Sequence, residues 1–142
     1  MKLVPLVVLS LSTLLFACSN ESNESTETKI QPIELHHLQK DWQLVSIDNI
    51  DIKTSSSLNV DEKAQATGNL ACNNFFGSLV LQKNKIRIDK MGRTRRMCAP
   101  DINSVEMMVS SILSTWSDVK ISDQKLTLTD EKHTLIYIPV TH

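Results

Sequence analysis

Residues 68–77 read GNLACNNFFG and combine two of the chain's three glycines with a cysteine, an asparagine pair and two phenylalanines. The glycines suit positions where the chain turns or passes close to another backbone. The asparagines readily form Asx-turns that satisfy local amides, and the phenylalanines can pack the segment against a core. We therefore predict a corner pinned by a disulfide. The alternative is a ligand-binding loop, because rigid loops often carry function.

The chain on both sides of this motif predicts an antiparallel sheet. Apolar and polar residues alternate with a period of two in short segments bounded by turn residues. These segments begin near Trp42 and continue at 57–60, 64–70, 78–82, 85–89, 119–122, 126–129 and 133–140. They amount to seven or eight strands.

One long amphipathic helix is predicted from Pro100 to about Ser117. Apolar residues recur there at intervals of three and four, which is helical spacing. The members of this stripe are Ile102, Val105, Val109, Ile112 and Trp116. We expect the stripe to be buried in the core. With a short helical turn at 32–40, these elements predict a domain of the α+β class.

The N-terminus has the pattern of a bacterial lipoprotein signal peptide. Lys2 supplies a positive charge, residues 3–16 are largely apolar, and small Ala17 directly precedes Cys18. The apolar run is shorter than the about 20 residues that a spanning helix needs. We predict a signal peptide over residues 1–17 and lipidation of Cys18. An ordinary signal peptide with a chance cysteine, or a simple N-terminal anchor, is the alternative.

The residues after Cys18 predict a tether and a location. Residues 19–31 are rich in Ser, Asn, Glu and Thr, a composition that cannot bury enough apolar surface to order itself. We predict a lipidated flexible tether over 18–31 and a folded domain over 32–142. Several acyl chains hold a protein on a membrane permanently. Residue 19 is Ser rather than the Asp that retains lipoproteins at the inner membrane, which favours the periplasmic side of a Gram-negative outer membrane.

Cys72 and Cys98 then remain as an even pair in a compartment where disulfides persist. A bridge of this span contributes about 3 to 4 kcal/mol in the chain-entropy model. Two free thiols or a thiol metal site are the alternatives. However, the chain has no Cys-x-x-Cys, and neither His37 nor His133 stands at ligand spacing from either cysteine. We therefore predict a disulfide and no metal.

The motif and later segments together resemble the META domain family. The matching parts are Trp-x-Leu at 42–44, Gly-x-x-x-Cys-Asn-x-Phe-x-Gly at 68–77, Thr-x-x-x-Cys at 94–98, Glu106 in the helix, and Leu-x-Leu and Leu-x-Tyr at 126–128 and 135–137. The resemblance implies an open, lipocalin-like antiparallel half-barrel with a helix set against its gap. It also implies an envelope protein linked to heat stress and to tolerance of novobiocin-type antibiotics.

The family brings no catalytic residue, so its motif positions carry over only as a possible binding loop. Those positions are Asn73, Asn74, Phe75, Gly77 and Thr94. The histidines offer no base beside a nucleophile, and the chain lacks a phosphate-binding loop and a His-Glu-x-x-His motif. We therefore predict neither an enzyme nor a cofactor.

Charge argues against nucleic acid as a partner. The chain has 15 basic and 16 acidic residues, and its one basic cluster, Arg93, Arg95 and Arg96, stands beside Asp89 and Asp101. So short a run is typical of a solvated turn.

We expect a monomeric binding or scaffold module, held on the membrane by its lipid, that supports the envelope under stress by holding a protein or lipid partner. A small-molecule binder that sequesters an apolar drug is one alternative. A thiol–disulfide redox protein is another, because Arg95 and Arg96 would lower the pKa of a reduced cysteine nearby.

Overall fold

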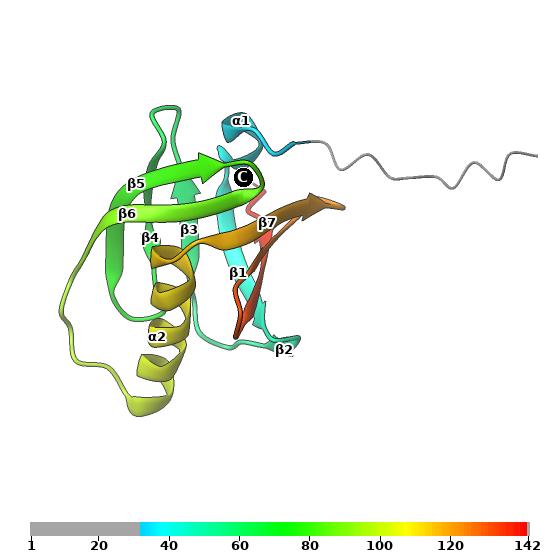
Figure 1. The fold of residues 1–142 in the computed structure, drawn as a ribbon. Helices are drawn as coiled ribbons and strands as arrows, with labels where there is room; N and C mark the ends of the chain where they lie inside the picture. Colours follow the sequence, from blue (N-terminus) through cyan, green and yellow to red (C-terminus); the bar gives the residue numbers. More distant parts are fainter. Residues whose placement is uncertain (1–31, 142) are drawn as a thin grey trace, which may run out of the picture. The chain divides into compact units, whose positions relative to one another are not determined.

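The computed structural model describes residues 32–141, so the predicted signal peptide at 1–17 and the tether at 18–31, including Cys18, lie outside the described residues. The elements follow the order α1 (Leu35–Leu38), β1 (Asp41–Ile47), β2 (Ile50–Asp51), β3 (Ser57–Val60), β4 (Gln65–Asn69), β5 (Asn74–Gln82), β6 (Lys85–Arg93), α2 (Pro100–Ser114), β7 (Ser117–Ser122), β8 (Lys125–Thr129) and β9 (Thr134–Pro139) (Figure 1). The α+β class agrees with the prediction. Neither helix in this range is long and apolar enough to cross a membrane.

The strands form a closed antiparallel barrel, so the prediction of an open half-barrel is wrong. Strands β3 to β9 pair in sequence order, β1 pairs with β3, and β1 also pairs with β9. The last pairing runs from Trp42 opposite Pro139 to Ile47 opposite Leu135, and it joins the two ends of the sheet. Short β2 extends the β3 side of β1. This pairing gives β9 a second neighbour, so β9 is not the unpaired edge that it would be in an open sheet.

The weakest seam of the barrel lies between β6 and β7, where the pairing comprises only Lys85 with Asp118 and Ile86 with Ser117. Helix α2 joins these two strands in sequence and packs against β6 (Figure 1). The expected helix against a gap is therefore present, but the gap is a thin seam rather than an opening.

Helix α2 has 15 residues and ends at Ser114, earlier than the predicted end near Ser117. Thr115 takes an extended conformation, and its N–H donates to the carbonyl of Ser111. The hydroxyl of Ser117, at the start of β7, donates to Ile112 O at 2.8 Å and satisfies another helix-end carbonyl. Trp116 therefore lies beyond the helix, although its spacing fits the apolar stripe.

The core is filled by alternate strand residues and by one face of α2. Its largest fully buried side chains are Trp42, Tyr137, Leu38, Leu44, Leu58, Leu70, Ile86, Ile112, Leu113, Leu126, Leu128 and Leu135. The indole of Trp42 donates to Leu38 O at 3.0 Å, which ties α1 to the barrel.

The motif at 68–77 is only partly a corner. Residues 70–73 turn between β4 and β5, and the turn is closed by a bond of 2.8 Å from Leu70 N to Asn73 O. Residues 74–77 already belong to β5. Gly68 lies in β4, where a Cβ would overlap the backbone of Ser57, so the glycine permits a close approach between strands.

Candidate functional site

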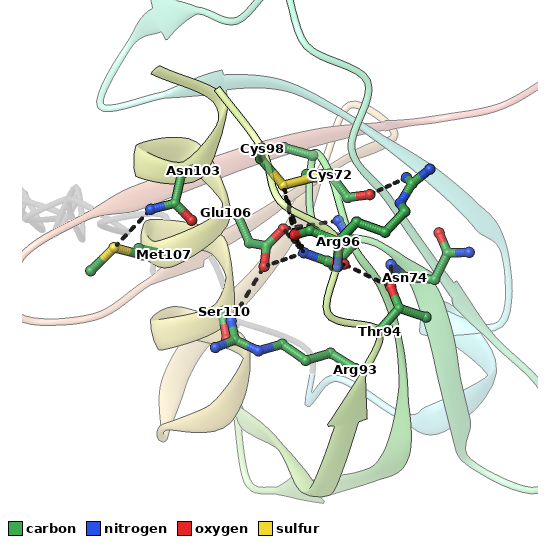
Figure 2. A network of polar contacts seen from close by, with 12 residues as sticks. Cys72, Asn74, Arg93, Thr94, Arg96, Cys98, Asn103, Glu106, Met107 and Ser110 are labelled. Carbon is green, nitrogen blue, oxygen red and sulfur yellow. Dashed lines mark hydrogen bonds and ion pairs between the residues drawn. A yellow bond between two sulfur atoms is a disulfide. The ribbon is translucent and has the colours of Figure 1, made fainter. Parts of the chain in front are cut away.

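Three segments of the chain meet at one end of β5 and β6 (Figure 2). They are the turn at 70–73, the segment 94–99 between β6 and α2, and α2 itself. The contacts that join them centre on one amide side chain, that of Asn73, which is buried. We call this set of residues the Asn73 network; its other members are Thr94, Arg96 and Glu106.

The Asn73 amide bonds to the segment 94–99 on both its oxygen and its nitrogen. Its Oδ1 accepts from the hydroxyl of Thr94 at 2.8 Å and from the backbone N–H of Arg96 at 2.7 Å. Its Nδ2 donates to the carbonyl of Arg96 at 3.2 Å. Both backbone groups of Arg96 are thus bound by one side chain, as a neighbouring strand would bind them.

The same amide nitrogen lies 3.1 Å from each carboxylate oxygen of Glu106. The backbone N–H of Asn73 also donates to this carboxylate, at 2.8 Å, and Arg93 Nη1 lies 3.4 Å from it. Glu106 is 3 % exposed, and burying a carboxylate is costly unless donors replace its water. The donors from Asn73 and Arg93 provide that replacement.

A disulfide joins Cys72 to Cys98 directly beside the network, with 6.2 Å between the Cα atoms. This is the pairing that the cysteine count predicts. The donor atoms of Cys72, Cys98 and Glu106 lie within 4.8 Å of one another, a spacing compatible with a metal site. Because the two sulfurs are bonded to each other, neither offers a thiolate to a metal in this state.

The structure brings together some of the predicted binding-loop residues and separates others. Asn73, Asn74 and Thr94 are neighbours: Asn74 N donates to Thr94 Oγ1 at 3.1 Å, and Thr94 N donates to Asn74 O at 3.0 Å. Phe75 and Gly77 do not belong to an exposed loop. Both are buried within β5, Phe75 in the core and Gly77 against Ile88.

Sequence reasoning did not assign a role to Glu106, although the residue is part of the family motif. A signal was present. Glu106 directly follows Val105 and lies four residues after Ile102, so it falls on the apolar stripe of α2. An acidic residue on a buried helical face requires partners inside the protein.

The network has no arrangement that would activate a nucleophile. Its hydroxyl, on Thr94, donates to the amide oxygen of Asn73 rather than to a base. His133 lies in the β8–β9 turn, 2.8 Å from Asp48. The pKa of Asp48 is lowered by the hydrogen bond from His133 and by a second one from the backbone of Thr134. This pair stabilises a turn and does not contribute to the network.

The surface of the described domain has two grooves, one beside the disulfide and one at the opposite end of β5 and β6. One, of about 350 Å³, runs beside the disulfide and is lined by Ala71, Cys72, Arg96, Met97, Cys98, Ala99 and Ile102. The other, of about 660 Å³, lies at the β5–β6 turn and is lined by Gln82, Lys83, Asn84, Lys85, Trp116 and Asp118. The guanidinium of Arg87 stacks 4.6 Å from the Trp116 ring centre.

Comparison with known proteins identifies the family. The model of the META domain matches residues 34–141 of this chain. The chain belongs to the META domain family. The resemblance inferred from the sequence motifs is thereby confirmed.

Three individual proteins illustrate how this META domain compares with its relatives. The heat shock protein HslJ of Escherichia coli (strain K12) is 30 % identical over 133 residues, which cover 90 % of this chain and 89 % of HslJ. A protein solved by NMR is 27 % identical with a TM-score of 0.67, covering 75 % of this chain and 95 % of its own. An NMR structure from Burkholderia xenovorans, 20 % identical with a TM-score of 0.61, covers 79 % and 92 % and supports the fold alone.

Proposed function

We propose that this META domain protein is a non-enzymatic binding module, anchored in the outer membrane through lipid on Cys18. It acts as a monomer facing the periplasm, and it supports the envelope under heat and antibiotic stress by holding a protein or lipid partner. The pattern of residues 1–18 supports the anchor. The name of the relative HslJ, a heat shock protein, supports the link to heat stress.

The observation that carries the non-enzymatic part of the proposal is the internal use of the polar groups at the family motif. The oxygen and the nitrogen of the Asn73 amide are both hydrogen-bonded inside the fold, to Thr94, Arg96 and Glu106. These bonds fix the conformation of the surface segment 94–99, and they leave no nucleophile beside a general base. A rigid surface loop beside a groove suits recognition better than catalysis.

Binding of a small apolar molecule is a second candidate, favoured by the groove at Trp116. The interior of the barrel is filled by buried residues such as Trp42 and Tyr137, so a ligand held inside would have to displace the core. The groove of about 660 Å³ instead offers the aromatic ring of Trp116 beside Lys83 and Lys85. Native mass spectrometry of protein purified from envelopes would detect such a ligand as a retained small mass.

A thiol–disulfide function is a third candidate, because both cysteines line the other groove. The reduction potential of the Cys72–Cys98 pair decides this question. A structural bridge lies below about −300 mV, whereas a working redox pair lies above that value.

The anchor is tested by Cys18→Ser in the full chain, followed by metabolic labelling with palmitate and by membrane fractionation. We expect label and membrane association to disappear. The Cys72→Ser/Cys98→Ser double variant is the matched control and should keep both. Equal labelling of wild type and Cys18→Ser would refute the anchor.

The role in stress is tested by deleting the gene and measuring growth at high temperature and with novobiocin. Wild-type protein should restore growth, and Cys18→Ser should not. A deletion strain that grows as well as its parent under both stresses would contradict the proposed role.

A further inference from the structure

We propose that residues 94–99 form a docking loop for an acidic, amphipathic segment of another protein. We call these residues the Arg–Met loop, since Arg95, Arg96 and Met97 form its exposed centre. The inference names a partner class for the binding module proposed above, and it rests on that proposal only for the location of the partner.

Met97 is 101 % exposed, so its whole apolar side chain is in water. A scattered exposed apolar residue is ordinary, but this one borders the groove of about 350 Å³ beside the disulfide. Ala71 and Ile102 supply further apolar surface to the same groove. Met and Arg are both enriched at protein interfaces. The groove and Met97 together could accept an apolar side chain of a partner.

Hydrogen bonds and the disulfide fix the backbone of the loop to the rest of the domain. Asn73 bonds to both backbone groups of Arg96 and to the hydroxyl of Thr94, and the disulfide fixes Cys98. Figure 2 shows the disulfide and the bonds of this network between the turn, the loop and α2. Because the loop is already ordered, a partner would lose little affinity to ordering it. Exposure on a clamped loop distinguishes Met97 from an apolar residue on a mobile one.

The charge of the loop specifies an acidic partner. Arg95 makes no hydrogen bond or ion pair with any residue of the described range 32–141, and Arg96 uses its guanidinium only to donate to the carbonyl of Cys72. The loop contains no acidic residue; the nearest after it is Asp101, at the start of α2. Guanidinium groups bind carboxylates with two parallel hydrogen bonds, which makes such contacts strong and directional.

The loop lies far from the point where the described chain begins. Ile33 N donates to Asn84 Oδ1 at 3.0 Å, which places the start of the domain at the β5–β6 turn. The Arg–Met loop follows the other end of β6, a strand of nine residues that spans roughly 25 to 30 Å. The loop and the start of the described chain therefore lie at opposite ends of β6. A protein partner is favoured by the groove beside Met97, which can accept a side chain.

The test uses the full chain, expressed with its own N-terminus and purified in neutral detergent. A fluorescent peptide of repeating glutamate and leucine is titrated with the protein, and binding is followed by anisotropy. A peptide with lysine in place of glutamate and phosphatidylglycerol vesicles are the comparison probes. We expect the glutamate peptide alone to bind, and to bind more weakly as salt is raised.

Three variants separate the loop from general charge and from folding. Arg95→Glu and Met97→Ser should each weaken binding about tenfold or more. The first removes a guanidinium that binds the glutamates of the peptide, and the second removes the apolar contact with its leucines. Lys63→Glu makes the same change of charge on a different exposed turn and should leave binding unchanged. Arg95 has no internal partner to lose, so the melting temperature of Arg95→Glu should equal that of the wild type.

The proposal is overturned if the glutamate peptide does not bind, if the lysine peptide binds equally, or if Arg95→Glu weakens binding no more than Lys63→Glu. Vesicle binding that depends on Arg95 would replace the protein partner with an anionic membrane. None of these binding results depends on whether Cys18 carries lipid. Failure of the docking loop and failure of the anchored module are therefore separate outcomes.

Discussion

Asn73→Ala should destabilise the domain far more than Asn74→Ala, although the two residues are neighbours with the same chemistry. The Asn73 amide bonds to Thr94, Arg96 and Glu106 in a buried setting. The Asn74 side chain accepts one bond, from Asn69 Nδ2 at 2.9 Å, at an exposed position. The comparison isolates the network from any general effect of replacing an asparagine.

The size of the effect follows from the bonds that are lost. Each neutral bond contributes about 1 kcal/mol, and a bond to a charged group contributes about 1.5 to 3 kcal/mol. Three neutral bonds and the contact with Glu106, reduced by the water that reaches the exposed Thr94, give a loss of about 4 kcal/mol for Asn73→Ala. That is a large part of the about 5 to 15 kcal/mol that stabilises a domain. It corresponds to a fall in melting temperature on the order of 15 °C. Asn74→Ala should cost less than about 0.5 kcal/mol.

The assay is urea and thermal unfolding followed by circular dichroism, with the disulfide intact. Glu106→Gln and the double variant with Asn73→Ala complete a cycle, in which we expect a coupling of more than about 1 kcal/mol. If Asn73→Ala loses no more stability than Asn74→Ala, the disulfide alone holds the loop and α2. The energetic role assigned to the network would then be refuted.

Three further predictions concern other features. Removing the bridge with Cys72→Ala and Cys98→Ala should cost about 3 kcal/mol in urea unfolding, and no loss relative to the oxidised wild type would contradict a stabilising role. Tyr137→Phe should raise stability by up to about 1 kcal/mol in thermal unfolding, because the Tyr137 hydroxyl is buried without a partner in the range 32–141; burial also raises the pKa of that hydroxyl. Asp48 should titrate below its usual pKa of 3.8 by NMR, and His133→Ala should raise its midpoint. Since the folded-state pKa is lowered, this pair stabilises the fold above pH 3.8, and its contribution disappears as the pH falls through the folded-state value.

The strands were predictable where alternation reports burial directly. Residues 126–129 alternate between buried and half-exposed in β8, and the sequence shows the same alternation. The start of β5 was not predictable in this way, because Asn74 and Gly77 resemble turn residues. Glycine here serves close packing within the sheet. A Cβ on Gly92 would lie 2.5 Å from the ring of Phe76, its partner across β5 and β6.

The closure of the barrel could not be derived from local patterns. It depends on β1 and β9, which lie at the two ends of the described chain and pair with a register shift between Leu44 and Ser46. Alternation specifies which face of a strand is buried, but it does not specify the strand's neighbour. The Asn73 network was only partly predictable. The motif indicated Asn73 and Thr94, but their contacts with Glu106 and Arg96 depend on how α2 and the segment 94–99 pack, which local patterns do not specify.

The network and the barrel seam are linked through α2. Strands β6 and β7 share only two residue pairs, and α2, which connects them in sequence, packs against β6 beside this short pairing. Asn73 and the Cys72–Cys98 bridge hold the N-terminal half of α2 and the Arg–Met loop to the β4–β5 turn. A partner that binds only the clamped loop must therefore stabilise the seam, because it favours the state in which the network is formed. Melting temperature should rise with the concentration of the acidic peptide, and Arg95→Glu should abolish the rise without changing the melting temperature of the free protein.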